Sequence, residues 1–311
     1  MGTPFISLLE PSKLEVYDRT KPHDQQPNQS SIAKTFLDAM EVREIVFVDE
    51  QKMPLEYEYD EDDPRSCHWV MYASVNQVVE QEQVDLHTGN IIRPRRSETR
   101  SQPIATLRIV PFPQPPHPKP GGWYEDYKLV DRPSSGPAAG SVSGAAPAPS
   151  PTPAAAPTAT ATSSSEEKAA AAAATGLGVG ATTLAAAEFP PPYAQDRATT
   201  FHDGQEPYVK IGRLAVHPTY RGRRIAGQLW AAARRWLEEH PRYFDPSVTE
   251  RGMEALGGGR DVPGWNGLVC AHAQEAAVKV YQGWGFQVDE GMGRWFEEGV
   301  PHVGMFTRLN V

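Results

Sequence analysis

Two spacings of apolar residues alternate along this chain, and each predicts its own kind of element. A spacing of three to four residues, which places side chains on one face of a helix, runs through residues 31–51, 221–239 and 274–282. Ser30 or Ser31 would cap the first of these helices. The apolar stripe of the second helix consists of Ile225, Leu229, Ala233, Trp236 and Leu237.

Short apolar runs predict the strands of the fold. They occupy residues 13–19, 68–75, 104–110, 209–216, 268–271 and 303–309. The polar stretch 80–102, between the second and third runs, is expected to form an elongated hairpin loop. Because strands and helices are interleaved, we predict an α/β (α+β) domain with a mixed central sheet flanked by helices.

A segment of different composition interrupts this pattern. Residues from about 133 to 187 are mostly Ala, Pro, Ser, Thr and Gly, and such a stretch cannot bury enough apolar surface to offset the entropy of ordering it. We predict a disordered insertion at 133–198 within a single domain, whose two parts are residues 1–132 and 199–311. The insertion is interpreted as a passive spacer, with a docking or phosphorylation segment as the alternative.

Composition limits the classes of partner. The 311-residue chain has a net charge of −9, which argues against general affinity for nucleic acid or anionic membranes. Cys67 and Cys270 do not form a CxxC pair, so neither a disulfide framework nor a metal site is predicted. The chain has no apolar run long enough to span a bilayer and no apolar signal core at its start. We expect a cytoplasmic protein, with the nucleus left open, and a homodimer is compatible with the sequence.

The strand at 209–216 leads through a basic turn, Arg221-Gly-Arg-Arg224, directly into a helix. A helix N-terminus behind a glycine-containing turn directs several backbone N–H groups toward one point, which is how proteins bind pyrophosphate. A phosphate-bearing ligand is therefore predicted here, although an exposed basic helix start is the alternative for this segment taken alone. The residues that add positive charge or permit close approach are Arg221, Arg223, Arg224, Gly222, Ala226 and Gly227.

The same turn resembles the cofactor motif Arg/Gln-x-x-Gly-x-Gly/Ala of the GNAT acetyltransferase superfamily, with Arg224 at the place of the first glycine. An arginine there is compatible with helical backbone angles. A second similarity is the strand and helix that end in Tyr281, followed by Gly285-Phe286. Residues 42–51 and 297–305 resemble segments of ElaA-like acetyltransferases, a branch related to the glucosamine 6-phosphate acetyltransferases. Four ordered motifs together imply a GNAT-like fold and acetyl-CoA as co-substrate.

The resemblance also implies where acetyl-CoA binds. The backbone of Leu214 and Val216 would pair with the pantetheine arm, and Gly212 would mark a bulge where this strand leaves its neighbour. The hydroxyl of Tyr281 would protonate the departing thiolate, with plain core packing as the alternative. The residues implied to contact the cofactor are Leu214, Ala215, Val216, Arg221, Gly222, Arg223, Arg224, Ile225, Ala226 and Gly227.

The implied reaction is direct acetyl transfer to a primary amine of a small molecule, with glucosamine 6-phosphate as one specific acceptor. A protein or peptide acceptor and a non-catalytic acyl-CoA-binding module are the alternatives. Cys270, in a predicted buried strand, shows no sign of activation as a nucleophile.

The base that takes the amine's proton is not evident, because the cofactor strand offers Lys210 and Arg213 but no carboxylate. Glu50 and His302 are the candidates singled out beside Tyr281, although Glu50 could simply end a helix and His302 could make a structural hydrogen bond. The acidic run 56–63 is typical of a solvated loop, yet its carboxylates would suit a cationic amine better than a sugar phosphate. The other candidates are Glu56, Glu58, His68, His272 and the solvent itself.

Overall fold

The structure is a computed structural model, and it describes residues 4–84, 90–131, 195–245 and 264–311. All of these belong to one unit made of Met1–Asp131 and Ala187–Val311. Most of the predicted insertion, residues 133–194, lies outside the described residues. The predicted domain boundaries therefore stay a prediction.

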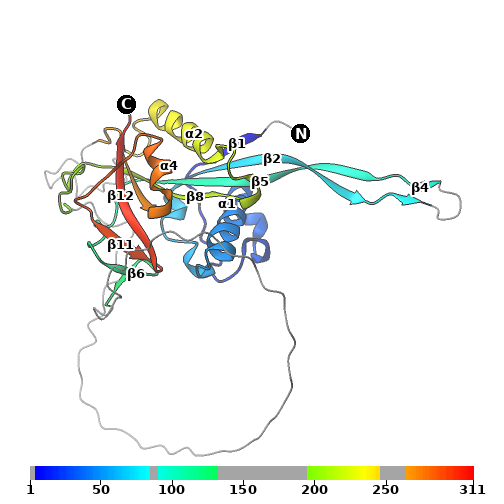
Figure 1. Cartoon of the computed structure of the whole chain (residues 1–311), viewed down its shortest axis with the longest axis horizontal. Helices are drawn as coiled ribbons and strands as arrows, with labels where there is room; N and C mark the ends of the chain where they lie inside the picture. Colours follow the sequence, from blue (N-terminus) through cyan, green and yellow to red (C-terminus); the bar gives the residue numbers. More distant parts are fainter. Residues whose placement is uncertain (1–3, 85–89, 132–194, 246–263) are drawn as a thin grey trace, which may run out of the picture. The chain divides into compact units, whose positions relative to one another are not determined.

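Among the described residues, ten strands form one mixed sheet (Figure 1). Neighbouring strands are antiparallel except for two parallel pairs, β8–β9 and β11–β6. Along the sheet the strands are β1 (Phe5–Leu9), β2 (Cys67–Glu80), β5 (Arg96–Val110), β8 (Val209–Val216), β9 (Leu268–Gln274), β12 (Val300–Arg308), β11 (Arg294–Glu297), β6 (Trp123–Glu125) and β7 (Lys128–Val130), with β10 (Gln287–Val288) beside β12. The short strands β3 (Gln83–Val84) and β4 (Ile91–Arg93) pair with each other.

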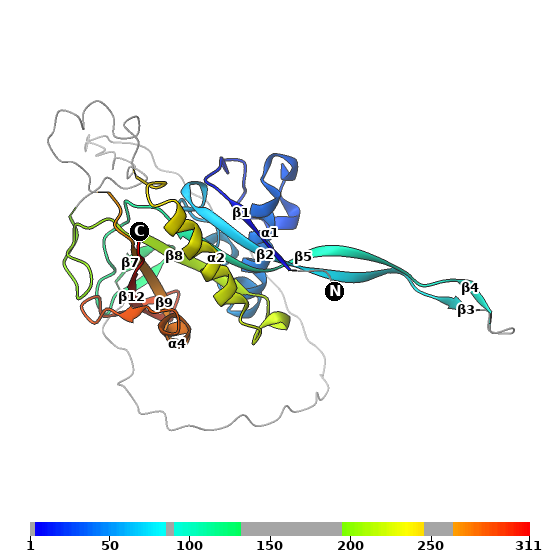
Figure 2. The same ribbon diagram turned by 90° about the horizontal axis from the view of Figure 1, so that it is seen from above.

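Helices cover both faces of the sheet. Trp69 and Met71 of β2 pack with α2 (Ile225–Glu239), whereas Val70 and Tyr72 pack with Ala39 of α1 (Lys34–Arg43). Because successive strand residues point to opposite faces, this alternation places α1 and α2 on opposite sides, as Figure 1 shows. Figure 2 shows α2 lying across the strands that it contacts, β2, β5 and β8. The predicted mixed sheet flanked by helices is confirmed.

The first helix continues past α1 as a π-helical segment, Glu44–Glu50, and a third helix, α4 (Val278–Gln282), follows the 3-10 turn Glu275–Ala277. The predicted serine cap is wrong, because Ala33 precedes α1 and Gln29–Ser31 form a 3-10 turn of their own. The remaining 3-10 turns are His23–Gln25, Leu55–Tyr57, Asp63–Arg65 and Pro218–Tyr220.

Two other predicted elements are wrong. Residues 13–19 form no strand: Leu14 and Tyr17 are joined by a turn and pack against Phe36 of α1. The polar stretch 80–102 is mostly strand, because β2 and β5 stay paired as far as Glu80 and Arg96 and project as a two-stranded arm (Figures 1 and 2). Backbone pairing needs no apolar face, so the apolar period could not reveal it.

The feature that positions the site is the opening between β8 and β9. Their parallel pairing ends at Ile211 and Ala271, while β9 runs on to Gln274 beside β12. On its other edge β8 bulges against β5, where Arg213 has a φ of 48°. Such a φ belongs to the left-handed region and turns the strand locally. The bulge expected at Gly212 lies at Arg213 and Leu214, directly after that residue, and the pairing of β8 with β9 ends just before Gly212, at Ile211.

Candidate active site

A cleft of about 1100 Å³ opens where β8 and β9 diverge. Its walls come from β8, the turn after it, the start of α2, the end of β9, α4 and the segment after α1. Of the ten residues expected to contact the cofactor, nine line this cleft, and Arg223 does not. The nine are Leu214, Ala215, Val216, Arg221, Gly222, Arg224, Ile225, Ala226 and Gly227.

The last five residues of β8 offer a free backbone edge to the cleft. Gly212, Ala215 and Val216 pair with β5 on one side. On the other side, among the described residues, no strand pairs with β8 beyond Ile211. An extended ligand that carries amides can hydrogen-bond to such an edge as an added strand would.

The basic turn at the head of α2 presents unpaired backbone donors. Gly222 has a φ of 75°, and Arg224, the residue before α2, has a φ of 59°. The expectation of helical angles at Arg224 is therefore wrong: this residue forms the turn, and the helix begins one residue later. The first N–H groups of α2 have no intrahelical acceptor, and with the helix dipole they favour an anion at this end. A Cβ on Gly222 would meet no atom within 4 Å, so the turn has open space beside it.

Arg221 and Glu50 meet at this turn. The guanidinium Nη1 of Arg221 donates to Oε1 of Glu50 at 2.7 Å, and a second bond joins Nη2 to Oε2. Hydrogen bonding from Arg221 lowers the pKa of the exposed Glu50 carboxyl. Glu50 does not line the cleft, so the structure sets this catalytic candidate beside the basic turn and outside the cleft.

Tyr281 lies on α4 and lines the cleft next to α2. Its ring packs edge-on against Trp284 and Phe286, and the side chain is buried. Burial raises the pKa of the Tyr281 hydroxyl well above its ordinary value. The group is therefore a neutral phenol at pH 7, which is the form that can donate a proton.

A carboxylate that the sequence analysis did not single out, that of Glu297, also lines the cleft. Oε1 of Glu297, in β11, accepts a hydrogen bond from Nε1 of Trp295 at 2.7 Å. The imidazole Nδ1 of His272 lies 3.7 Å from Oε1, and Nε2 of His302 lies 3.8 Å from Oε2. Burial would raise the pKa of Glu297, but His302 and His272 outweigh it and lower that pKa. His302 thus stays a candidate, and Glu297 and His272 join it in one cluster.

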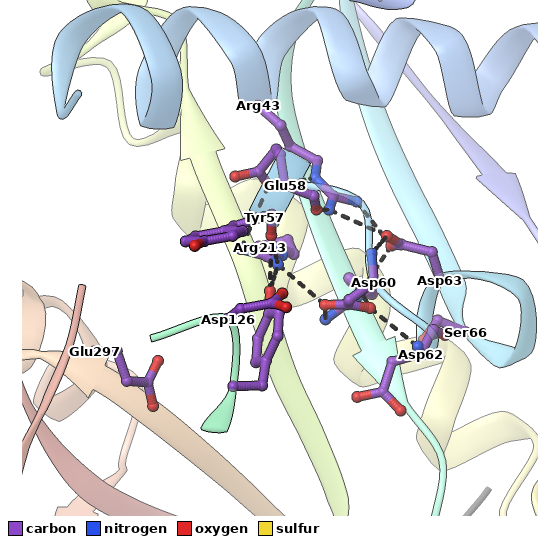
Figure 3. A network of polar contacts seen from close by, with 12 residues as sticks. Arg43, Tyr57, Glu58, Asp60, Asp62, Asp63, Ser66, Asp126, Arg213 and Glu297 are labelled. Atoms are coloured by element: carbon purple, nitrogen blue, oxygen red, sulfur yellow. Dashed lines mark hydrogen bonds and ion pairs between the residues drawn. The ribbon is translucent and has the colours of Figure 1, made fainter. Parts of the chain in front are cut away.

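The acidic run 56–63 is solvated only in part: Glu56 and Glu61 are exposed, whereas Glu58 and Asp63 are buried. Arg43 of α1, which is fully buried, donates to Glu58 at 2.7 Å and to Asp63 at 2.8 Å. Arg108 of β5 and Arg213 of β8 donate to Asp60 at 2.8 Å and 3.0 Å. Figure 3 shows Arg43, Glu58, Asp60, Asp63 and Arg213 converging, with Glu297 apart from them. Pairing with these distant arginines offsets the free-energy cost of burying the carboxylates. Without such partners, the charged carboxylates would be too costly to bury.

The remaining base candidates lie in structural contacts. Nε2 of His68 is hydrogen-bonded to the carbonyl of Asp63 at 2.9 Å and the ring is buried, while Glu58 is held by Arg43. Glu56 does not line the cleft, and its carbonyl accepts a bond from Arg19. Burial raises the pKa of the Cys270 thiol, so this cysteine is a poor nucleophile.

Two features are absent from the part of the chain that the structure describes. The described residues contain no group of three or more His, Cys, Asp or Glu side chains that could hold a metal ion. They also contain no helix with the length and apolar character needed to cross a membrane.

Part of the chain matches the model of a known protein family. The model of the acetyltransferase (GNAT) family matches residues 170–251, which include β8, the basic turn and α2. Among solved structures, Escherichia coli ElaA is 14% identical, covering 98% of this chain and 100% of that chain with a TM-score of 0.39. An acyl-CoA N-acyltransferase from Pseudomonas aeruginosa is 14% identical, covering 98% of this chain and 99% of that chain with a TM-score of 0.37. No curated protein matches the sequence. The chain has a GNAT-like mixed sheet, and the segment that shapes its cleft matches the acetyltransferase (GNAT) family.

Proposed function

We propose that this protein is an acetyl-CoA-dependent N-acetyltransferase that transfers acetyl directly to a primary amine of a small molecule. The observation that carries the proposal is the cleft itself, where the free edge of β8 leads to the basic turn at the head of α2. The edge suits the amides of pantetheine, and the turn suits a pyrophosphate. The motifs at residues 42–51 and 297–305 further favour the ElaA-like branch of the family.

The residues of the cleft then have distinct tasks. Gly212–Val216 would hold the pantetheine arm extended, so that the thioester lies where β8 and β9 diverge. Holding the amine and the thioester in contact accounts for much of the rate gain in such reactions. Tyr281 would give a proton to the sulfur as the C–S bond breaks. Acetyl-CoA supplies the activated acyl group, and no nucleophile of the protein is needed.

The test is release of free thiol from acetyl-CoA by the purified full-length protein. The acceptor panel would contain arylalkylamines, polyamines, amino acids, glucosamine 6-phosphate and short peptides. We expect release with a small amine and a several-fold higher KM for acetyl-CoA in Arg221→Gln. The matched control is Arg235→Gln, which removes an exposed arginine paired with Glu239 on the outer face of α2. Acetyl-CoA binding without turnover on any amine would contradict the proposal and indicate a binding module.

A further inference from the structure

Glu297 and His302 both line the cleft, and their side chains leave room for a hydrogen-bond donor between them. Nδ1 of His302 lies 2.9 Å from the carbonyl of Val300, and a carbonyl only accepts, so Nδ1 carries the hydrogen. In the neutral ring Nε2 is then a lone-pair acceptor. It faces Oε2 of Glu297 at 3.8 Å, which is too long for a hydrogen bond. When His302 is neutral, two acceptors therefore face each other across a gap; when it is protonated, its charge is the one that lowers the pKa of Glu297.

The separation of Nε2 of His302 and Oε2 of Glu297 suits an ammonium group that binds to both atoms. A nitrogen that donates to both atoms, with bonds of about 2.8 Å each, can sit at the apex of a triangle whose base is the separation of the two acceptors. Both partners are held in place: Trp295, which is fully buried, binds Glu297 through Nε1 and stacks on His302. His272, on the strand that diverges from β8, adds a buried Nε2 that has no partner among the described residues.

We propose that Glu297 and His302 bind the acceptor amine as its ammonium ion and that Nε2 of His302 takes its proton. The inference rests on the proposed function and names its acceptor class: a cationic primary amine without a phosphate. The cations that line the cleft on β5 and β8 favour that class, because Arg108 and Arg213 already pair with Asp60, and Nζ of Lys210 lies 3.7 Å from Oδ2 of Asp62. Apolar side chains of the segment after α1, Val46, Phe47 and Met53, line the same cleft and suit an apolar body on the amine.

The reaction balances as follows. The ammonium gives one proton to Nε2 of His302, and the neutral nitrogen forms the C–N bond with the acetyl carbonyl carbon. The C–S bond breaks with its electron pair on sulfur, which takes up one proton. The nitrogen loses its second proton to solvent on amide formation, solvent restores the phenol of Tyr281 that protonated the sulfur, and the imidazolium returns its proton to water. One proton is released per turnover.

Two kinds of measurement test this assignment. In kinetics with 2-phenylethylamine, Glu297→Gln should raise the KM for the amine about 10-fold to 100-fold, since it removes a charged hydrogen-bond acceptor. The KM for acetyl-CoA should stay within about twofold in this variant, because the basic turn is untouched. His302→Gln should lower kcat while the KM for acetyl-CoA again stays within about twofold. The control is Glu290→Gln, an exposed carboxylate on the turn before β11.

The second measurement needs no turnover, so it separates this inference from the proposed function. Ring ¹⁵N NMR of histidine-labelled protein, assigned with His302→Gln, should show His302 as the Nδ1–H tautomer. Adding 2-phenylethylamine in the presence of CoA should shift its Nε2 signal in the wild type but not in Glu297→Gln. A permanent imidazolium, an Nε2–H tautomer, or variants that behave like Glu290→Gln would overturn the inference. So would equal or better turnover of glucosamine 6-phosphate.

Discussion

Arg221, the first residue of the basic turn, donates hydrogen bonds to both carboxylate oxygens of Glu50. Glu50 lies at the end of the π-helical segment after α1. The pair joins two residues that are 171 positions apart in the sequence, and of the two only Arg221 lines the cleft. A phosphate that binds at the head of α2 has to compete with this carboxylate for the same guanidinium.

Replacing Glu50 by Gln should therefore tighten acetyl-CoA binding. An exposed ion pair of this kind is worth little, so we expect the Kd to fall about twofold to fivefold with almost no change in stability. Calorimetric titration with CoA would measure it, and Glu239→Gln, which breaks the exposed pair with Arg235, is the matched control. Weaker binding in Glu50→Gln would mean that Glu50 orients Arg221 for the phosphate instead of competing with it.

Removing the hydroxyl of Tyr281 should slow the chemical step. The phenol stays neutral because burial raises its pKa, so it can protonate the departing sulfur. We expect Tyr281→Phe to lower kcat by about 100-fold while the urea midpoint and the KM for acetyl-CoA stay close to wild type. Tyr208→Phe is the control, since Tyr208 is also buried but packs in another cluster with Trp295 and Phe306. Equal losses in both variants would indicate a packing effect.

Arg43 is expected to be the most sensitive charged residue for stability. Arg43→Met would leave Glu58 and Asp63 buried with part of their compensating charge removed. Breaking a buried pair in this way costs about 3–5 kcal/mol. Urea unfolding at pH 7 measures the loss, with Arg234→Met on exposed α2 surface as the control that should change little. A loss of less than about 1 kcal/mol in Arg43→Met would show that the cluster relaxes or admits water.

The same cluster of buried carboxylates and arginines predicts that the folded protein loses stability in acid. Burial alone would raise the pKa of Asp60, but Arg108 and Arg213 outweigh it and hold that pKa well below its ordinary value. A carboxyl whose pKa is lower in the folded state contributes stability that is present above its unfolded pKa of about 4 and is lost as the pH falls below it. The unfolding free energy should therefore begin to drop below about pH 5 and keep dropping until the pH falls through the lowered pKa of folded Asp60. In Asp60→Asn the drop should be smaller, whereas Asp24→Asn, at an exposed site, should keep the wild-type slope.

The elements that could be predicted from the sequence are those whose pattern lies in consecutive residues. The strand β8 and the helix α2 follow from continuous apolar patterns, and the turn between them follows from its glycine and arginines. The positive φ of Arg224 could not be predicted, because arginine shows no preference for it and only the surrounding fold imposes it.

The acidic cluster and the Glu297–His302 pair needed the tertiary structure. Asp60 looks solvated in sequence because Arg108 and Arg213, its partners, lie 48 and 153 residues away. Glu297 meets His302 through the β11–β12 hairpin, and both meet His272 only because β12 pairs with β9. A Glu-x4-His spacing in one hairpin was the available signal, and it is weak without the sheet that brings the strands together.

The predicted insertion offers the last test. Its composition predicts that residues 133–198 form a passive spacer, yet the match to the acetyltransferase family begins at residue 170. Two variants test whether the whole insertion is a spacer. One deletes residues 133–169 and keeps the matched segment, and the other replaces residues 133–194 by a Gly/Ser linker. A passive spacer predicts that both variants keep wild-type thiol release and acetyl-CoA affinity, because long insertions add little to closure entropy. If only the longer deletion loses acetyl-CoA affinity, residues 170–194 contribute to the cofactor site and the spacer ends before them.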